Sequence, residues 1–482
     1  MNMITIEGPK YTNEFVFVHV NKDFIPKKVS PCEFHNLNLE IAEESCFYFL
    51  RYGFVPPPLT IYANLLCLPV GLDVVFDTSN RSIKFKDDFR FVAGRSKEDS
   101  KPDLKTLENL VHKSVEKSLS TSSENILMQS GGKDSTVLVQ SLSRYKVSHK
   151  IRCITYEASF RDRESEAAKS ISQHYGLEHE IVTPDYDLEF SLLKKHYNMH
   201  GSILSADCTL PPYLHALSKF QKANVIDGLG NDMYMGYIGT KIEMLLNFLN
   251  LSWLDDYEPS KFSNSEILNY GVSTFFMTSE ERMFPGTKLA ISEIKSIVGL
   301  NFENYFRNFI SKKSQKLDID DSKASIRARF CDLALFQMKG LQASMLSGNK
   351  ITFPFGDNAL FEYYFRLPKN MRYSKKKRIN KVFLRKFLDS FDVDKSFINR
   401  KSGFRYDMEA FIKHNASEIR DLLSNSGFAE KGLDSFLKLH LDKINYISAS
   451  KIYILVSFAL WMKSNKSKNR VKLHIASNFF KS

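Results

Sequence analysis

The strongest constraint on the fold is an alternation of two kinds of segment that starts near residue 104. Short apolar runs, NILMQ, KIRCITYEA, HEIVT and NVIDG, alternate with longer stretches whose apolar residues recur at helical spacing. Strands that alternate with helices of ten or more residues predict βαβ units and a parallel sheet. Right-handed crossovers place helices on both faces of such a sheet. We therefore expect an α/β fold that binds its ligands at the carboxyl ends of the strands.

The regions on either side of this alternation have different patterns of apolar and turn-forming residues. Residues 1–100 are expected to form a small β-rich domain, because NEFVFVHV, SCFYFLRYGF and LDVVFD carry aromatic and β-branched residues between turn signals. The charged stretch GRSKEDSKPD, residues 94–103, predicts a linker, so that a second domain spans residues 104–482. After residue 237, segments such as SIRARFCDLALFQMKGLQASML and KIYILVSFALWM predict a helical layer on the sheet.

Composition excludes several classes of protein. None of the six cysteines forms a CxxC pair, so neither a zinc site nor a disulfide framework is indicated, and reduced thiols in a cytoplasm are expected. No signal-peptide pattern begins the sequence, and no apolar run reaches the roughly 20 residues that span a bilayer. The net charge of +12 attracts nucleotides, pyrophosphate and nucleic acid alike and does not choose among them.

The stretch ENILMQSGGKDSTVLVQSL, residues 124–142, carries the clearest chemical signal. Gly131 and Gly132 have no Cβ, so the backbone can turn sharply between strand and helix and approach a ligand closely. The backbone N–H groups of such a turn and of the following helix face one concavity, which holds an anion. The Walker loop needs four residues between its outer glycine and Gly-Lys, so this is a different phosphate loop.

Polar side chains surround these two glycines, and each fits the binding of phosphate. They are Ser130, Lys133, Asp134, Ser135 and Thr136. The hydroxyl groups add hydrogen-bond donors, and the lysine adds positive charge. A carboxylate suits an anion site when Mg²⁺ bridges it to phosphate oxygens. The sequence therefore predicts a site for ATP or pyrophosphate together with Mg²⁺.

The hexapeptide SGGKDS resembles the pyrophosphate loop, Ser-Gly-Gly-x-Asp-Ser, of the ATP-pyrophosphatase (PP-loop) superfamily. Further stretches, in the order typical of the family, resemble asparagine synthetase and the related β-lactam synthetases across roughly residues 104–465. These stretches are RESEAAKSISQHYGLEHEIVT, VIDGLGNDMYMGY, ASMLSGNKITFPFGDNALFEYYFRLP, and INKVFLRKFL followed by INRKSGF. The resemblance implies a ligase that uses ATP and Mg²⁺, releases AMP and pyrophosphate, and joins a carboxylate to an amine or ammonia as an amide or lactam.

The same resemblance implies roles for particular residues. Asp232 would share Mg²⁺ with Asp134, and Gly230 and Asp357 would belong to the substrate pocket. Lys401 would be the catalytic cation that stabilises charge on the α-phosphate. Other interpretations stay open at this point: Asp232 and Asp357 could each instead cap a helix N-terminus, and Lys401 could be an ordinary surface lysine.

Three positions depart from the family pattern. Where the family pocket has a glutamate, this chain has Lys350, and where the family has an arginine, this chain has Thr352. The family also has a glutamate directly after the metal aspartate, and here that residue is Met233. Lys350 could deprotonate the attacking amine if its pKa is lowered, or it could recognise an acidic group of the substrate. Lys381, in KKKRINK, is expected at a solvated helix start rather than at a phosphate.

The N-terminal region also departs from the family. A glutamine-hydrolysing domain begins with cysteine after the initiator methionine, whereas position 2 here is Asn2. We therefore expect a shortened remnant of a glutaminase-like (Ntn-type) domain without glutaminase activity, and a nitrogen supplied as free ammonia or as another amine. Lactam synthetases and lasso-peptide cyclases, which resemble asparagine synthetase, use such amines.

Two other functions remain open on the sequence. A PP-loop enzyme that modifies tRNA would suit the basic balance and Lys133, although the thiolating type needs a CxxC pair. A catalytically degenerate nucleotide-binding scaffold would suit Met233 and Lys350. The expected partners are a small-molecule or peptide carboxylate and an amine, rather than nucleic acid or a membrane, and the oligomeric state is left open.

Overall fold

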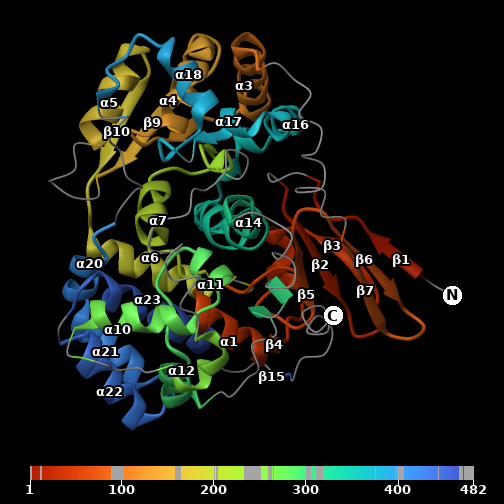
Figure 1. Cartoon of the computed structure of the whole chain (residues 1–482), viewed down its shortest axis with the longest axis vertical. Coiled ribbons are helices and arrows are strands. Elements are labelled where there is room, and N and C mark those ends of the chain that lie inside the picture. Colours follow the sequence, from red (N-terminus) through yellow and green to blue (C-terminus); the bar gives the residue numbers. More distant parts are fainter. Residues whose placement is uncertain are drawn as a thin grey trace.

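Figure 1 shows the computed structural model, with a sheet and its helices at the top, a helical lobe at the bottom, and β-rich structure at the right. The structure describes residues 3–10, 14–87, 102–157, 164–199, 201, 203, 205–232, 251–258, 263, 265–299, 306–307, 309–310, 319–374, 376–396, 398, 406–442, 444–465 and 470–471. Most of the predicted linker, together with Met233 and Lys401, lies outside the described residues.

A parallel sheet of five strands forms the centre of the upper part, in the order β10-β9-β8-β11-β12. The strands are β8 (Asn125–Met128), β9 (Ile151–Tyr156), β10 (Glu178–Val182), β11 (Asn224–Asp227) and β12 (Lys350–Thr352). The chain builds outward from β8 to β10 and then returns to add β11 and β12 on the other side of β8. The strand order thus reverses between β8 and β11, which is where α/β sheets of this kind bind ligands.

Helices cover both faces of the sheet, and the side-chain alternation of the strands explains how. Leu127 and Ile226 belong to one buried cluster, whereas their neighbours Ile126 and Val225 belong to another, because successive strand residues point to opposite faces. The face that carries Leu127 and Ile226 packs against α3 (Leu104–Ser118), α4 (Lys133–Leu142), α5 (Glu164–His174), α16 (Asn358–Arg366) and α18 (Val382–Asp389). The second face, which carries Ile126 and Val225, packs against α6 (Tyr186–Asn198), α7 (Leu210–Ser218) and α15 (Met338–Leu346). The predicted α/β fold with helices on both faces is confirmed.

The N-terminal region contains two antiparallel three-stranded sheets. One joins β1 (Met3–Ile6), β6 (Leu72–Asp77) and β7 (Ser82–Asp87), and the other joins β3 (Pro26–Val29), β2 (Val16–Val20) and β5 (Leu65–Leu68). A short β4 (Ile41–Ala42) pairs in parallel with β15 (Arg470–Val471). Apolar residues of these sheets join the same buried cluster as the second face of the parallel sheet. The domain boundary near residue 100 therefore stays a prediction.

One β assignment in this region is wrong. SCFYFLRYGF lies largely in a helix, α1 (Glu43–Tyr52), which ends at Gly53 in the left-handed conformation with φ 76°. All residues of this helix from Glu44 to Tyr52 are buried. A helix that is buried all round carries no polar stripe, so its sequence shows no helical period.

The second half of the chain forms the expected helical layer. Its helices include α10 (Glu266–Ser273), α11 (Ser279–Met283), α12 (Ile291–Val298), α14 (Ile319–Ile326), α17 (Lys369–Arg372), α20 (Met408–His414), α21 (Ala416–Ser424), α22 (Glu430–His440) and α23 (Tyr446–Ser464). A short hairpin, β13 (Tyr373–Ser374) and β14 (Ile379–Asn380), leads into α18.

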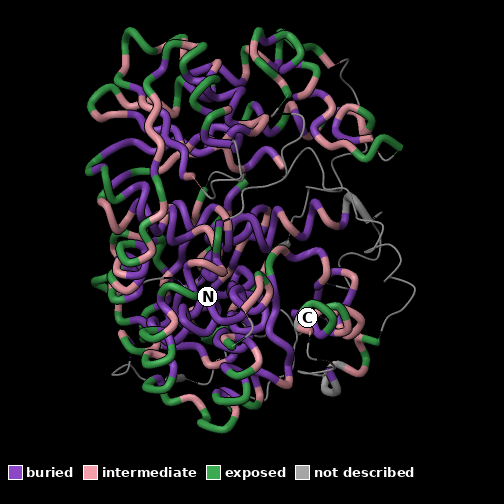
Figure 2. The backbone as a smooth tube through the Cα atoms, turned by 90° about the vertical axis from the view of Figure 1, so that its left-hand side faces the viewer, coloured by how far each residue is buried: buried purple, intermediate pink, exposed green. Residues whose placement is uncertain are grey.

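The apolar helix α23 runs through the interior of the lower lobe. It is buried without interruption from Ser448 to Trp461, and Figure 2 shows buried backbone through the middle of this lobe with exposed segments around it. Within the described part of the chain, no helix has the length and apolarity that crossing a membrane requires.

Candidate active site

A cavity of about 570 Å³ lies at the carboxyl ends of β8, β9 and β11. Its walls come from the loops after β8 and β11, from α7, and from the residues around the start of α15. Asn380 of β14 and the residue that follows it, Lys381, complete the lining. The cavity thus lies at the point where the strand order reverses, as the sequence predicts for a ligand site.

The loop after β8 is held in place by its own hydroxyl groups. Ser130 Oγ accepts a hydrogen bond from the Gly132 N–H at 3.2 Å and lies 3.1 Å from Ser135 Oγ. The Gly131 N–H donates to the carboxylate of Glu164 at 3.1 Å. The first N–H groups of α4 have no partner within the helix, and the residues that carry them line the cavity. This end of α4 is suited to bind an anion.

The predicted phosphate-loop residues do not all reach the cavity. Ser130, Gly132, Lys133, Asp134 and Ser135 line it, whereas Gly131 and Thr136 do not. The buried hydroxyl of Thr136 donates to the Gly132 carbonyl at 2.8 Å, so this side chain shapes the turn. The Lys133 ammonium donates to the Ile398 carbonyl at 2.9 Å and so ties the loop to the chain beyond α18.

The two predicted metal ligands, Asp134 in the first turn of α4 and Asp232 beyond β11, share one cation. Lys381 Nζ lies 2.9 Å from Asp232 Oδ1 and also donates to Asp134 Oδ2. The amide of Asn231 donates to the other oxygen of Asp134. Burial alone would lower the pKa of Lys381, but Asp134 and Asp232 together raise it above its ordinary value. The expectation that Lys381 starts a solvated helix is wrong, because its side chain is only 8% exposed.

The donor set fits Mg²⁺, with one condition. Two carboxylates and a buried amide oxygen, Asn231 Oδ1, which has no hydrogen-bond partner, are the oxygen ligands that this ion prefers. Among the residues whose placement is described, no group of three or more His, Cys, Asp and Glu side chains could hold a metal alone. An ion here would therefore share phosphate oxygens. The condition is that the Lys381 ammonium first leaves the two aspartates.

The cavity also carries a second polar cluster that the sequence did not reveal. Asp227, the last residue of β11, is buried and accepts a hydrogen bond from the Tyr213 hydroxyl. Burial raises the pKa of Asp227 to about 6. Lys339 Nζ lies 3.1 Å from Asp207 Oδ2 and 4.9 Å from the centre of the Tyr213 ring. Asp227 could have been noticed, since it ends the strand NVID directly before a glycine.

A rare helix type forms part of the wall near this cluster. Residues Arg327–Gln337 form a π-helix, a geometry that is uncommon and recurs at functional sites. Arg327, Asp332 and Phe336 of this stretch line the cavity. The Arg327 guanidinium lies 3.5 Å from Asp332 Oδ1 and 5.5 Å from the centre of the Phe336 ring. The sequence predicted a helix here but not its π geometry.

The remaining predicted site residues fall in different places. Gly230 lines the cavity with φ 111°, a conformation that side-chain-bearing residues rarely adopt. Asp357 caps α16, where it accepts hydrogen bonds from backbone N–H groups, and its carboxylate lies 2.7 Å from Lys117 Nζ. Lys350 is exposed and pairs in register with Asn224, at the amino ends of β12 and β11. The structure therefore brings neither Asp357 nor Lys350 into the cavity lining.

A parallel sheet with a glycine-containing anion loop and two aspartates at its switch point defines a nucleotide-binding α/β protein. The sequence matches the asparagine synthase family over residues 106–463, and the chain belongs to this family. Membership implies an ATP-dependent ligase of the amide-forming kind. No curated protein matches the chain.

Proposed function

We propose that the chain adenylates a carboxylate with ATP and Mg²⁺, releases pyrophosphate, and passes the acyl group to an amine or ammonia to make an amide or lactam. One observation carries this proposal: the SGGKDS loop and the Asp134–Asp232 pair converge on one cavity at the switch point of the sheet. Family membership supports the coarser part, an ATP-dependent ligase.

The phosphate half of the cavity suits the leaving group. The first turn of α4 offers backbone N–H donors, and Ser130 and Lys133 add a hydroxyl and a positive charge. When bound, Mg²⁺ supplies positive charge that neutralises the phosphate oxygens. Asp134 and Asp232 would hold that ion. Lys401 remains the proposed cation for the α-phosphate, on the basis of its Arg-Lys-x-Gly-Phe motif.

The acceptor half of the cavity suits proton transfer. We assign Asp227 as the group that takes a proton from the attacking amine. It is the carboxyl that ends β11, and β11 lies beside β8, which leads into the phosphate loop. Its pKa near 6 allows it to be ionised at neutral pH while still accepting a proton during the reaction. Tyr213, which donates a hydrogen bond to it, would orient the carboxylate.

The substrates are proposed by chemical class only. A small-molecule or peptide carboxylate and an amine or free ammonia fit the reaction, and the cytoplasm suits both ATP and reduced cysteines. A nucleic-acid substrate or a scaffold without catalysis would give different results in the experiment that follows.

The test is ATP–pyrophosphate exchange, measured over a panel of carboxylic acids and short peptides, with hydroxylamine added to trap acyl-adenylates as hydroxamates. We expect exchange that depends on one class of carboxylate and falls at least about 1,000-fold in Asp134→Ala. Asp187→Ala, which alters an aspartate whose side chain is 83% exposed, should leave exchange unchanged. Exchange that requires added RNA, or no exchange with any carboxylate, would overturn the proposal.

A further inference from the structure

We propose that Lys381 is a resident counter-ion: it holds the cation position between Asp134 and Asp232 until a metal–nucleotide complex takes its place. This inference rests on the proposed use of ATP with Mg²⁺. The counter-ion would make metal binding depend on the nucleotide. Free metal would bind weakly, and metal and nucleotide would bind together as a complex.

The contacts of Asp134 carry the first step. One of its oxygens accepts from Lys381 and the other from the Asn231 amide, so nitrogen donors already contact both oxygens. The second aspartate, Asp232, lies 2.9 Å from the same ammonium. A divalent ion that binds between these carboxylates must therefore compete with an ammonium that is already there.

The backbone supplies an independent second step. Lys381 has φ 54°, in the left-handed region that residues with a Cβ adopt only at a cost in free energy. It is the N-cap residue of α18 but its side chain caps nothing. A positive charge at a helix N-terminus is also unfavourable. Neither the backbone conformation nor the capping of α18 favours a lysine at this position. The ion pairs of Lys381 with Asp134 and Asp232 do account for it.

Exchange follows from what the displaced ammonium needs next. Once a divalent ion holds the aspartates, the buried Lys381 side chain requires new anionic partners, because an unpaired buried charge is costly. Arg385 on the next turn of α18 and Lys133 across the loop are positive and offer none. Phosphate oxygens in the same cavity would offer them. Metal without nucleotide leaves the ammonium unpaired, so the two ligands should bind cooperatively.

The experiment uses Mn²⁺ as the probe and the full chain. Mn²⁺ binding is titrated by electron paramagnetic resonance, with and without α,β-methylene-ATP, in the unaltered chain and in Lys381→Met. We expect the unaltered chain to bind Mn²⁺ weakly alone and at least tenfold more tightly with the nucleotide. Lys381→Met should bind Mn²⁺ alone at least tenfold more tightly than the unaltered chain, and should gain less from the nucleotide.

Two further variants keep the result interpretable. Lys377→Met removes an exposed lysine four residues earlier in the chain and should bind Mn²⁺ as the unaltered chain does. Lys381→Arg keeps the charge and should keep weak binding of Mn²⁺ alone, which tests the idea even if Lys381→Met does not fold. Equal Mn²⁺ affinity in the unaltered chain and a folded Lys381→Met, or tight Mn²⁺ binding in Lys381→Arg, overturns the inference.

The outcome is separable from that of the proposed function. Mn²⁺ binding that changes as expected, without any carboxylate-dependent pyrophosphate exchange, supports the counter-ion and contradicts the ligase. Exchange with a carboxylate, together with Mn²⁺ binding that is insensitive to Lys381→Met, supports the ligase and contradicts the counter-ion.

Discussion

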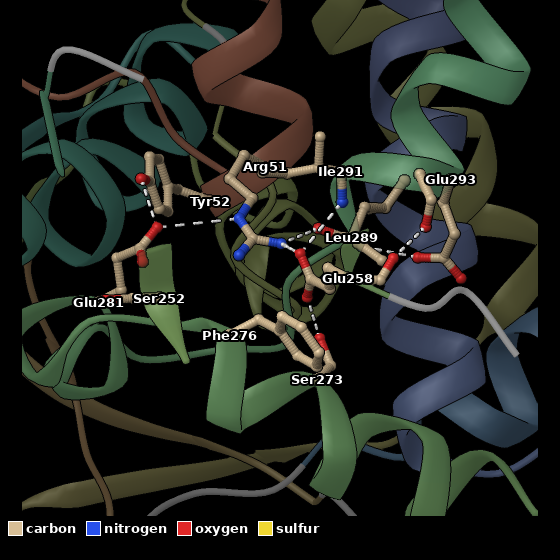
Figure 3. Close-up of polar contacts among 12 residues, drawn as sticks. Arg51, Tyr52, Ser252, Glu258, Ser273, Phe276, Glu281, Leu289, Ile291 and Glu293 are labelled. Carbon is tan, nitrogen blue, oxygen red and sulfur yellow. Dashed lines mark hydrogen bonds and ion pairs between the residues drawn. The ribbon is translucent and has the colours of Figure 1, made fainter. Parts of the chain in front are cut away.

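Two groups of buried charges, one in the cavity and one in the lower lobe, are built in opposite ways. In the lower lobe, Arg51 is fully buried, and its Nη1 donates to Glu258 at 2.8 Å and to the Leu289 carbonyl at 2.6 Å. Figure 3 shows this arginine among its partners, with Glu281 accepting a hydrogen bond from Tyr52. In the cavity, by contrast, one ammonium, that of Lys381, contacts two aspartates, and among the described residues the cation that acts on Asp227 is Lys339.

The directions of the carboxyl pKa shifts follow this difference. Burial would raise the pKa of Glu281, but Arg307 and Arg51 outweigh it and lower the pKa to about 2. Burial likewise raises the pKa of Asp227, and there Lys339 does not outweigh it, so the pKa stays near 6. A buried carboxyl whose partners lower its pKa contributes to stability in its ionised form, whereas one whose pKa is raised is ionised at a cost and is available to a proton.

The largest expected effect is on stability in the lower lobe. Arg51→Met leaves Glu258 and Glu281 buried with one shared cation fewer, and we expect a loss of about 3–5 kcal/mol in the free energy of unfolding. Denaturant unfolding measures it. Arg366→Met, which breaks a pair with Glu362 that is largely exposed, should cost less than about 1 kcal/mol. A loss for Arg51→Met as small as that of the control would contradict the stabilising role of the network.

A pH series with Glu281→Gln tests the same network through its titration. The folded pKa of about 2 lies below the ordinary value of 4.5, so the stabilisation is present above pH 4.5 and disappears as the pH falls toward 2. At neutral pH we expect Glu281→Gln to be less stable by about 3 kcal/mol, from the shift in pKa. The difference from the unaltered chain should shrink below pH 4.5. A difference that does not vary with pH would show that lost packing, rather than charge, causes it.

Asp227→Asn should act in the opposite direction. The folded pKa of about 6 lies above the ordinary 3.8, so the ionised carboxyl destabilises the fold, most fully above pH 6. The amide cannot ionise, so we expect Asp227→Asn to be more stable by about 2–3 kcal/mol at pH 8 and nearly unchanged below pH 4. Amide formation should fall by about 100-fold or more, while pyrophosphate exchange persists. A variant that is less stable at pH 8 would contradict the cost assigned to this carboxylate.

What the sequence could predict depends on how far apart the interacting residues are in the chain. The parallel sheet and the glycine turn between β8 and α4 follow from local strand–turn–helix patterns, and the structure shows both. The convergence of Asp134 with Asp232 is expected from the family resemblance and from the position of both residues at carboxyl ends of strands, and in the structure both aspartates contact the Lys381 ammonium. The contact between Lys381 and Asp134 joins residues 247 positions apart, and no local pattern records such a contact. The Arg51 network is equally remote, since Glu258 lies 207 positions away.

The smallest expected effect concerns the lysine that the sequence placed in the substrate pocket. Counting from the glycine in the family motif identifies Lys350 but does not say at which end of a strand it lies. It begins β12, so its exposed side chain lies at the amino end of the sheet, opposite the cavity. We therefore expect Lys350→Glu to change the free energy of unfolding by less than about 0.5 kcal/mol and to leave both half-reactions unchanged. A tenfold loss of amide formation with intact pyrophosphate exchange would instead give Lys350 a role in the use of the amine. In that case the cavity would not contain the whole acceptor site. The comparison of the cavity charges with the Arg51 network would then have to count Lys350, at the amino end of the sheet, among the functional charges.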